Sequence, residues 1–170
     1  MMRAFELNEL QQVLGARQLG ENCTLQRVLT DSRQLAPGDL FVALKGPNFD
    51  GHDFVGAAEL KGAAAVVVDH EVDTRLPQLV VTDTLKALGQ LGGYNRSLFR
   101  APVFAVTGSG GKTTVKEMLA GLMALKGEVL ATEGNLNNEI GAPLTLLRLA
   151  PEHRSAVIEL GASAQGEIAR

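Results

Sequence analysis

The chain has 170 residues, of which 45% are hydrophobic and 21% are charged, and its formal net charge at pH 7 is −3. These values predict a folded, soluble protein of one or two domains, and they argue against a general nucleic-acid-binding protein, which carries a basic excess. No run reaches the roughly 18 apolar residues of a membrane span, and the lone Cys23, which has no partner for an internal disulfide, fits a reducing cytoplasm.

The first half of the chain alternates short helical and extended patterns. Leu7, Leu10, Val13 and Leu14 share one helical face. A Pro-Gly turn introduces an apolar strand at residues 40–44. Further patterns predict a helix within 53–62 and strands within 25–33, 63–70 and 78–82.

The second half continues this alternation around one glycine-rich loop. A helix is predicted over residues 83–99, although three glycines weaken it. The later patterns predict strands at 103–107, 128–132 and 156–160, and helices at 112–125, within 139–149 and from 166. Strands that alternate with helices indicate an α/β fold with mostly parallel strands.

Two domains are therefore expected, with their boundary in the region of residues 82–100. Residues 1–82 form a small α/β domain, and residues 83–170 form a linker helix and the first part of a parallel-sheet domain. Two or three strands are fewer than a doubly wound nucleotide domain needs. We therefore expect a part of a longer protein.

The glycine-rich segment TGSGGKTT, residues 107–114, joins an apolar strand to a helix. The strict phosphate-loop motif G-x-x-x-x-G-K-[ST] would need a glycine at Val106, so this loop is a shorter variant. Backbone N–H groups at a helix start attract phosphate, Lys112 adds a positive charge, and the Thr113 hydroxyl suits Mg²⁺. The alternative is an ordinary glycine turn with an exposed lysine, but the strand–loop–helix order favours a nucleoside triphosphate site.

Two later features stand where ligands bind in such sheets. Glu159 ends the apolar run AVIEL, and a carboxylate at the end of a parallel strand is either a Mg²⁺ ligand or a solvent-facing charge; spacing alone supports both equally. The segment GNLNNEIGAP carries Asn137 and Asn138, for which helix capping is favoured from the residues alone over contact with a ligand.

A polar segment, DSRQLAPGDLFVALKGPNFDGHDF, spans residues 31–54. Ser32 and Arg33 suit a phosphate, and Lys45 and His52 add donors, although ordinary turn chemistry also explains the composition. His70 and His153 have no recognisable partners and are expected at the surface. The histidine spacing does not suggest a zinc site.

Together these segments resemble the Mur ligases, ATP-dependent enzymes that add amino acids during peptidoglycan synthesis. The similarity rests on TDSRQLAPGDLFVALKGPNFDGHDF, VTGSGGKTTVKEML, GNLNNEIGAPLTLLRL and AVIELGAS, and it covers the whole chain. Among family members, the asparagine segment is most similar to the one that adds D-alanyl-D-alanine to UDP-N-acetylmuramoyl-tripeptide. The alternatives are the relative that adds the third amino acid and a non-catalytic module that binds UDP-sugar and nucleotide.

The resemblance implies a UDP-sugar-peptide-binding domain followed by an ATP-binding domain, in a cytoplasmic enzyme that is monomeric when full length. It implies ATP and Mg²⁺ as cofactors, with catalytic roles for Lys112 and Glu159 and metal-binding roles for Thr113 and Glu159. It implies nucleotide contacts for Gly108, Ser109, Gly110, Gly111, Lys112, Thr113, Thr114, Asn137 and Asn138. It implies UDP-sugar contacts for Ser32, Arg33, Lys45 and His52. Relatives often carry histidine at the position of Ala164. They also have a later carbamoylated lysine and a third domain, so the resemblance implies that this part is inactive by itself.

Overall fold

The computed structural model describes residues 3–161, and the chain divides into two compact units inside helix α3 (Thr84–Leu98). The first unit comprises residues 3–91, and the described part of the second comprises residues 92–161. The division falls within the region of residues 82–100 that the sequence analysis gave for the boundary, nine residues after the domain end at residue 82. The expected helix from residue 166 and the Ala164 position lie outside the described residues. Among the described residues, no helix is both long and apolar enough to cross a bilayer.

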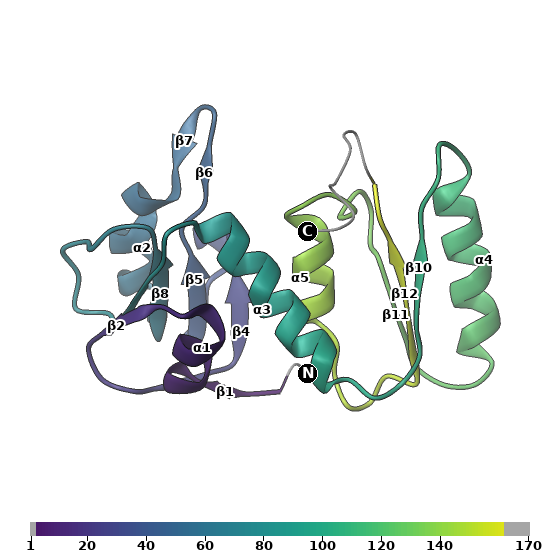
Figure 1. The fold of residues 1–170 in the computed structure, drawn as a ribbon, viewed down its shortest axis with the longest axis horizontal. Coiled ribbons are helices and arrows are strands. Elements are labelled where there is room, and N and C mark those ends of the chain that lie inside the picture. Colours follow the sequence, from purple (N-terminus) through teal and green to yellow (C-terminus); the bar gives the residue numbers. More distant parts are fainter. Residues whose placement is uncertain (1–2, 162–170) are drawn as a thin grey trace. The chain divides into compact units, whose positions relative to one another are not determined.

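The first unit is built on a five-stranded sheet in the order β2-β9-β8-β5-β4 (Figure 1). Its strands are β2 (Arg17–Leu19), β4 (Arg27–Leu29), β5 (Asp39–Val42), β8 (Ala65–Val68) and β9 (Gln78–Val80). The four later strands pair in parallel, whereas β2 runs antiparallel to β9. Strands β5 and β8 are buried along their whole length, as their nearly continuous apolar sequences require of central strands.

Short elements complete this unit. Two antiparallel ribbons pair β1 (Phe5–Glu6) with β3 (Thr24–Leu25) and β6 (Lys45–Gly46) with β7 (Phe49–Asp50). The helices are α1 (Leu7–Leu14) and α2 (Val55–Leu60), with 3₁₀ turns η1 (Ser32–Gln34) and η2 (Gly51–Phe54). Strand β2 and both ribbons were not predicted, because runs of two or three residues carry little periodic signal.

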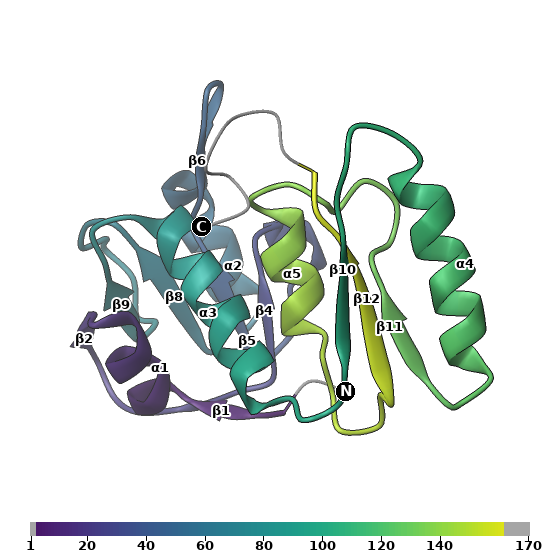
Figure 2. The same cartoon turned by 45° about the vertical axis from the view of Figure 1, so that its right-hand side comes forward.

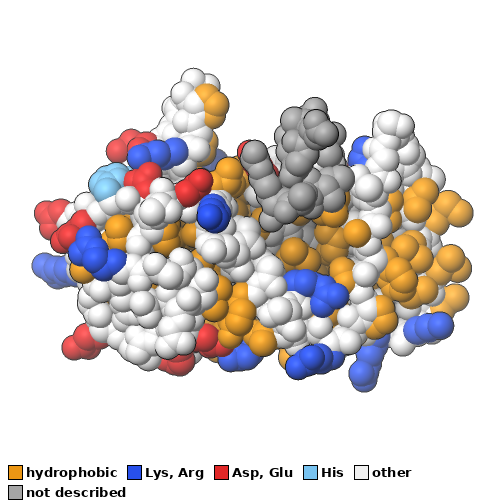
Figure 3. Space-filling view, viewed as in Figure 1, with side chains coloured by type: hydrophobic (Ala, Val, Ile, Leu, Met, Phe, Trp, Pro, Cys, Tyr) orange, Lys and Arg blue, Asp and Glu red, His pale blue; other side chains and the backbone are white. Residues whose placement is uncertain are grey.

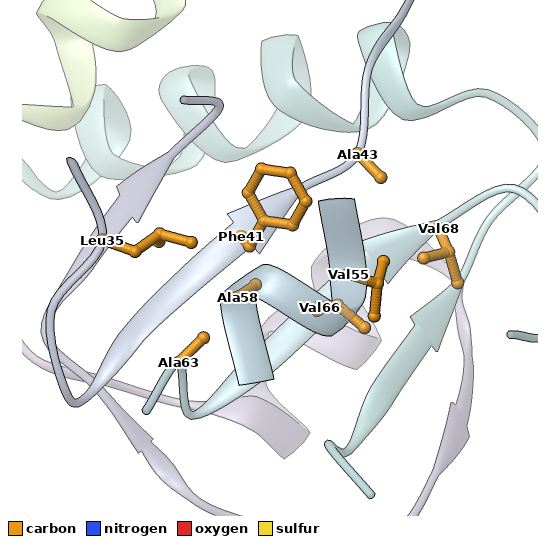
Figure 4. Packing of buried hydrophobic residues seen from close by; sticks show 8 residues of the cluster. All are labelled: Leu35, Phe41, Ala43, Val55, Ala58, Ala63, Val66 and Val68. Carbon is orange, nitrogen blue, oxygen red and sulfur yellow. The ribbon is translucent and has the colours of Figure 1, made fainter. Parts of the chain in front are cut away.

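One hydrophobic core cluster of the first unit lies between the sheet and helix α2 (Figure 4). Phe41 of β5 and Val66 of β8 face Val55 and Ala58 of α2, and all four are nearly inaccessible to water. A buried side chain of the valine class stabilises a fold by about 1.5–3 kcal/mol. This packing fixes the position of β5, which lies in the middle of the polar segment 31–54.

The second unit contains a parallel three-stranded sheet in the order β10-β12-β11. Its elements are β10 (Val103–Val106), α4 (Lys112–Ala124), β11 (Val129–Ala131), α5 (Gly141–Leu147) and β12 (Ser155–Glu159). Helices α4 and α5 lie on opposite faces of this sheet (Figures 1 and 2). The predicted α/β class with mostly parallel strands is confirmed.

Within the second unit, the C-terminal half of α3 packs closely on α5. A Cβ atom at Gly92 would lie 2.9 Å from the Pro143 Cα, so only glycine allows this approach. The buried Asn95 amide donates to the carbonyl oxygens of Leu146 and Leu149 at 2.9 and 3.1 Å. These bonds satisfy carbonyl groups at the end of α5, and they fix the helix that follows the asparagine segment.

Helix α4 has one apolar face in solvent. Val115, Met118, Leu122 and Leu125 are between 52% and 84% exposed. Hydrophobic side chains gather at the right of Figure 3, the side on which Figure 1 places α4. The opposite side of the helix contacts β10, β11 and β12.

Candidate nucleotide and metal site

The glycine loop joins β10 to α4 at the carboxyl edge of the second sheet. Gly111 adopts a φ of +72° immediately before the helix, and Gly108 a φ of +148°, both in the region that L side chains rarely adopt. The Lys112 ammonium donates to the Gly108 carbonyl oxygen at 3.0 Å, so its side chain folds back over the loop. Thr113 and Thr114 lie exposed in the first helical turn, where backbone N–H groups lack intrahelical partners.

Glu159 lies beside the start of this loop. In the parallel pairing of β10 with β12, Glu159 is opposite Val106, and the Leu160 N–H donates to the Val106 carbonyl oxygen at 2.9 Å. The Glu159 residue is 2% exposed, so the alternative of a solvent-facing strand-end charge is wrong. The carboxylate is buried at the edge of the sheet where the glycine loop begins.

The two oxygen atoms of the Glu159 carboxylate have different surroundings. Oε1 accepts a hydrogen bond from the Asn137 side-chain amide at 2.8 Å. Oε2 is buried and has no hydrogen-bond partner among the described residues. A buried carboxylate oxygen without a partner is costly unless a donor or a cation satisfies it. Hard oxygen ligands of this kind are those that Mg²⁺ prefers, so the residues present fit a divalent cation.

The asparagines of the segment GNLNN take different positions. Asn137 contacts Glu159, and its backbone carbonyl oxygen accepts from the Gly161 N–H at 2.7 Å. The Asn138 Oδ1 accepts from the N–H groups of Ile140 and Gly141 at 3.2 and 2.8 Å, at the start of α5. Asn138 thus caps a helix, as the residues alone favoured, whereas Asn137 orients the carboxylate.

Sequence reasoning missed two residues that connect α4 to β12. The Lys116 ammonium is buried and donates to the Thr132 carbonyl oxygen at 2.7 Å. The Thr132 hydroxyl oxygen accepts from the Glu159 backbone N–H at 2.9 Å. The available signal was the position of Thr132 at the carboxyl end of a parallel strand, the same signal that singled out Glu159.

A second polar cluster lies in the first unit, near the β6–β7 ribbon. Lys45 pairs with Asp69 at 2.9 Å and with Asp50 at 3.6 Å. His52 Nδ1 contacts the Asp50 carboxylate, and its Nε2 accepts from the Asp69 N–H at 3.1 Å. The cluster therefore brings Lys45 and His52 together through two carboxylates.

The charged groups of this cluster stabilise one another's ionised forms. The hydrogen bond to Asp69 raises the pKa of the Lys45 ammonium. The His52 backbone N–H and ring hold the pKa of Asp50 below its usual range. Burial by itself raises the pKa of Asp69, but hydrogen bonds from Lys45 and His70 outweigh it and the net pKa is lowered. Both carboxylates remain ionised at neutral pH.

His70 and His153 make contacts that were not predicted from the sequence. His70 is exposed, but it stacks on His52 with ring centroids 4.5 Å apart and contacts Asp69. Ligand atoms of His52, Asp69 and His70 lie within 4.8 Å of one another, a grouping that spacing did not suggest. Because His52 Nε2 already accepts the Asp69 N–H, metal ligation there would break that bond. His153 is not a simple surface residue either, since its Nδ1 accepts from the Ala150 N–H at 3.1 Å.

Ser32 and Arg33 stand apart from these contacts, in η1. The Asp31 carboxylate accepts from both the backbone N–H and the guanidinium of Arg33, with bonds of 2.8–3.2 Å. These side-chain bonds hold the pKa of Asp31 well below its usual range. The Arg33 side chain is 87% exposed, so its outer face is accessible to an oxyanion.

Comparisons with known proteins show which family both units resemble. Residues 106–170 match the Mur ligase middle domain, and residues 24–94 match the catalytic domain of the Mur ligase family. The UDP-N-acetylmuramoyl-tripeptide–D-alanyl-D-alanine ligase of Escherichia coli is 52% identical over 99% of this chain and 37% of its own length. The Bacillus subtilis ligase of the same name is 42% identical over 87% of this chain and 33% of its own length.

Solved structures give the same result. MurF from Acinetobacter baumannii superposes with a TM-score of 0.93 at 44% identity, over 98% of this chain and 38% of that one. MurF ligase from Thermotoga maritima in complex with ADP gives 0.77 at 38% identity, over 85% of this chain and 34% of that one. The chain thus spans between 33% and 38% of the length of these relatives. On the strength of its two units and their matches, it belongs to the Mur ligase family.

Proposed function

We propose that this chain forms part of an ATP-dependent ligase that adds D-alanyl-D-alanine to UDP-N-acetylmuramoyl-tripeptide in the cytoplasm. The observation that carries the proposal is the buried Glu159 carboxylate, with Oε2 unsatisfied, at the edge where the phosphate loop begins. That arrangement suits a nucleotide with a divalent cation. The named relatives supply the reaction class.

The chain's own residues supply charge and orientation for phosphoryl transfer. In the proposed reaction, the terminal carboxylate of the tripeptide attacks the γ-phosphorus, the bond to the bridging β-γ oxygen breaks, and ADP leaves. Two anions must meet in this step, so the Lys112 ammonium and the loop N–H groups offset the charge of the phosphate oxygens. Lys112 would release the Gly108 carbonyl to do so.

Thr113 and Glu159 would hold Mg²⁺, which when bound neutralises phosphate charge. Asn137 keeps the carboxylate oriented through Oε1, and Oε2 remains for the cation. The acyl phosphate is then attacked by the dipeptide amine, which loses a proton as the amide forms and inorganic phosphate leaves. None of the described residues is proposed as the acceptor of that proton.

In the first unit, we propose that Ser32, Arg33, Lys45 and His52 contact the UDP-sugar peptide. Arg33 and Lys45 are each held by carboxylates on one side, which restricts their motion and leaves the remaining donors to a phosphate. The His52 ring is bonded at both nitrogens, so a substrate contact by His52 would replace one of these two bonds.

The alternative is the relative that adds the third amino acid. A solved UDP-N-acetylmuramoyl-L-alanyl-D-glutamate–2,6-diaminopimelate ligase superposes with a TM-score of 0.59 at 20% identity, which supports a shared fold alone. The greater identity to the D-alanyl-D-alanine ligases favours the first candidate.

The test is a chimeric ligase, in which this chain replaces the matching segment of the E. coli relative. We expect ATP-dependent amide formation from UDP-N-acetylmuramoyl-tripeptide and D-alanyl-D-alanine, and loss of turnover on Lys112→Ala. Turnover with UDP-sugar dipeptide and a diamino acid instead would support the alternative. An inactive but folded chimera would contradict both ligase assignments and leave a non-catalytic binding module.

A further inference from the structure

The Lys116 side chain is a buried cation that the proposed reaction does not use. Its residue is 2% exposed, and it follows Lys112 by one turn of α4. The ammonium pairs with Glu117 Oε1 and donates to the Thr132 carbonyl oxygen, each at 2.7 Å. Glu117 is itself 67% exposed, so the buried end of the interaction is the Thr132 carbonyl.

Thr132 lies where β11 leaves the sheet. Strand β11 ends at Ala131, and the Thr132 N–H still donates to the Val157 carbonyl oxygen at 3.0 Å. On the same side of β12, the next N–H is that of Glu159, and it donates to the Thr132 hydroxyl rather than to a backbone carbonyl. The side chain thus replaces a rung of the ladder and frees the Thr132 carbonyl for Lys116.

The result is a continuous link between two parts of the site. One end is α4, whose first residues are Lys112 and Thr113, and the other is the backbone of Glu159. The Glu159 carboxylate is fixed separately by Asn137. The link therefore sets the distance between the helix start and the carboxylate, the two sources of the proposed metal ligands.

We propose that Lys116 and Thr132 are positioning residues, which hold the phosphate-loop helix in register with Glu159 so that one divalent cation meets both Thr113 and Glu159. This inference rests on the proposed nucleotide function. Groups that orient metal ligands typically change metal affinity or activity by about 10–100-fold when they are removed. A buried lysine bonded to a carbonyl is suited to this, because its bond resists competition from water.

The experiment compares isosteric variants in the 170-residue chain and in the chimeric ligase. Thr132→Val removes the hydroxyl, Thr132→Ser keeps it, and Lys116→Met removes the ammonium. Thr145→Val is the matched control, since its buried hydroxyl donates to the Gly141 carbonyl oxygen in the same unit without touching Glu159. Lys126→Met controls for loss of an exposed lysine after α4.

The readouts are Mn²⁺ affinity in the presence of ADP, by electron paramagnetic resonance of the chain, and the Mg²⁺ dependence of the chimera. We expect Thr132→Val and Lys116→Met to weaken Mn²⁺ binding by about 10-fold or more and to raise the Mg²⁺ concentration for half-maximal rate. The KM for the tripeptide substrate should not change. Thr132→Ser should restore both values.

The outcomes separate this inference from the function on which it rests. If the unsubstituted chain does not bind Mn²⁺ with ADP and the chimera is inactive, the proposed function fails. If both work and Thr132→Val behaves as Thr145→Val does, the positioning role alone is overturned. If Thr132→Val does not fold, Lys116→Met decides by the same criterion, and failure of both to fold assigns the residues to the fold and overturns the proposal.

Discussion

Replacement of Glu159 by Gln gives a prediction whose sign depends on the ligand. In the free chain, Oε2 is a buried carboxylate oxygen with no partner among the described residues, and Oε1 accepts from Asn137. Glu159→Gln keeps the shape and the bond from Asn137 but removes the buried charge. A buried unsatisfied polar group costs about 1–3 kcal/mol, and more when it is charged.

The glutamine amide in Glu159→Gln also has one group without a hydrogen-bond partner. The expected gain in the free energy of unfolding is therefore the penalty for the unpaired carboxylate oxygen minus the penalty for the unpaired amide group. We expect the variant without ligand to be as stable as the parent chain or more stable by about 1 kcal/mol. With Mg²⁺ and ADP the order should reverse. A ligand at 100 times its Kd adds about 2.7 kcal/mol to the folded state, and the variant should lose most of that gain.

The assay is urea unfolding, followed by tyrosine fluorescence, with and without Mg²⁺ and ADP. Tyr94 is the single tyrosine, no tryptophan is present, and Tyr94 belongs to the second unit, so the signal reports on the unit that carries the site. Glu128→Gln is the control, an exposed carboxylate just before the start of β11. The reasoning is refuted if Glu159→Gln destabilises the ligand-free unit by more than about 1 kcal/mol, or if both proteins gain equally from the ligand.

Three further outcomes are expected in the first unit. Asp39→Asn should cost about 2 kcal/mol in urea unfolding, because it weakens the bidentate bond from the half-exposed Arg27 to a buried carboxylate; a cost below about 0.5 kcal/mol would contradict this. Burial, and to a smaller extent the charge of Glu6, raise the pKa of the Cys23 thiol. Cys23 in the folded chain should therefore react with iodoacetamide more slowly than in the urea-unfolded chain, and Glu6→Gln should speed the reaction of the folded chain. Equal rates in these comparisons would refute this explanation. Because the folded pKa of Asp31 is lowered, its contribution to stability is fully present above about pH 4, the ordinary pKa of an aspartate. It is lost progressively as the pH falls from there toward the lowered folded pKa, so the stability difference between the parent and Asp31→Asn should begin to shrink below about pH 4. A difference that is constant with pH would exclude the charge as its source.

Elements with a long or chemically distinctive sequence pattern could be predicted from the sequence alone. The helix after the loop was predicted at residues 112–125 and is observed at Lys112–Ala124, because a strand, three glycines and a helix in that order leave few alternatives. Glu159 was singled out by the same reasoning, which places ligands at the carboxyl ends of parallel strands.

Contacts between distant residues could not be predicted in this way. Lys116 and Thr132 are 16 positions apart, and Thr132 and Glu159 are 27 apart, so no local pattern joins them. The β6–β7 ribbon was missed because each of its strands has two residues. The contact between His70 and His52 was also not predicted, because no local sequence pattern joins the two residues. They meet because β8 ends beside η2.

The most direct test of the central claim is the response of backbone amides to nucleotide. In ¹⁵N-labelled chain, titration with ADP and Mg²⁺ should shift the resonances of residues 108–114 and of Glu159, with weak affinity, and omission of Mg²⁺ or Lys112→Ala should reduce the response. Shifts that spare the loop, or that are the same without Mg²⁺ and in Lys112→Ala, would contradict the assignment of this edge of the sheet as a metal–nucleotide site.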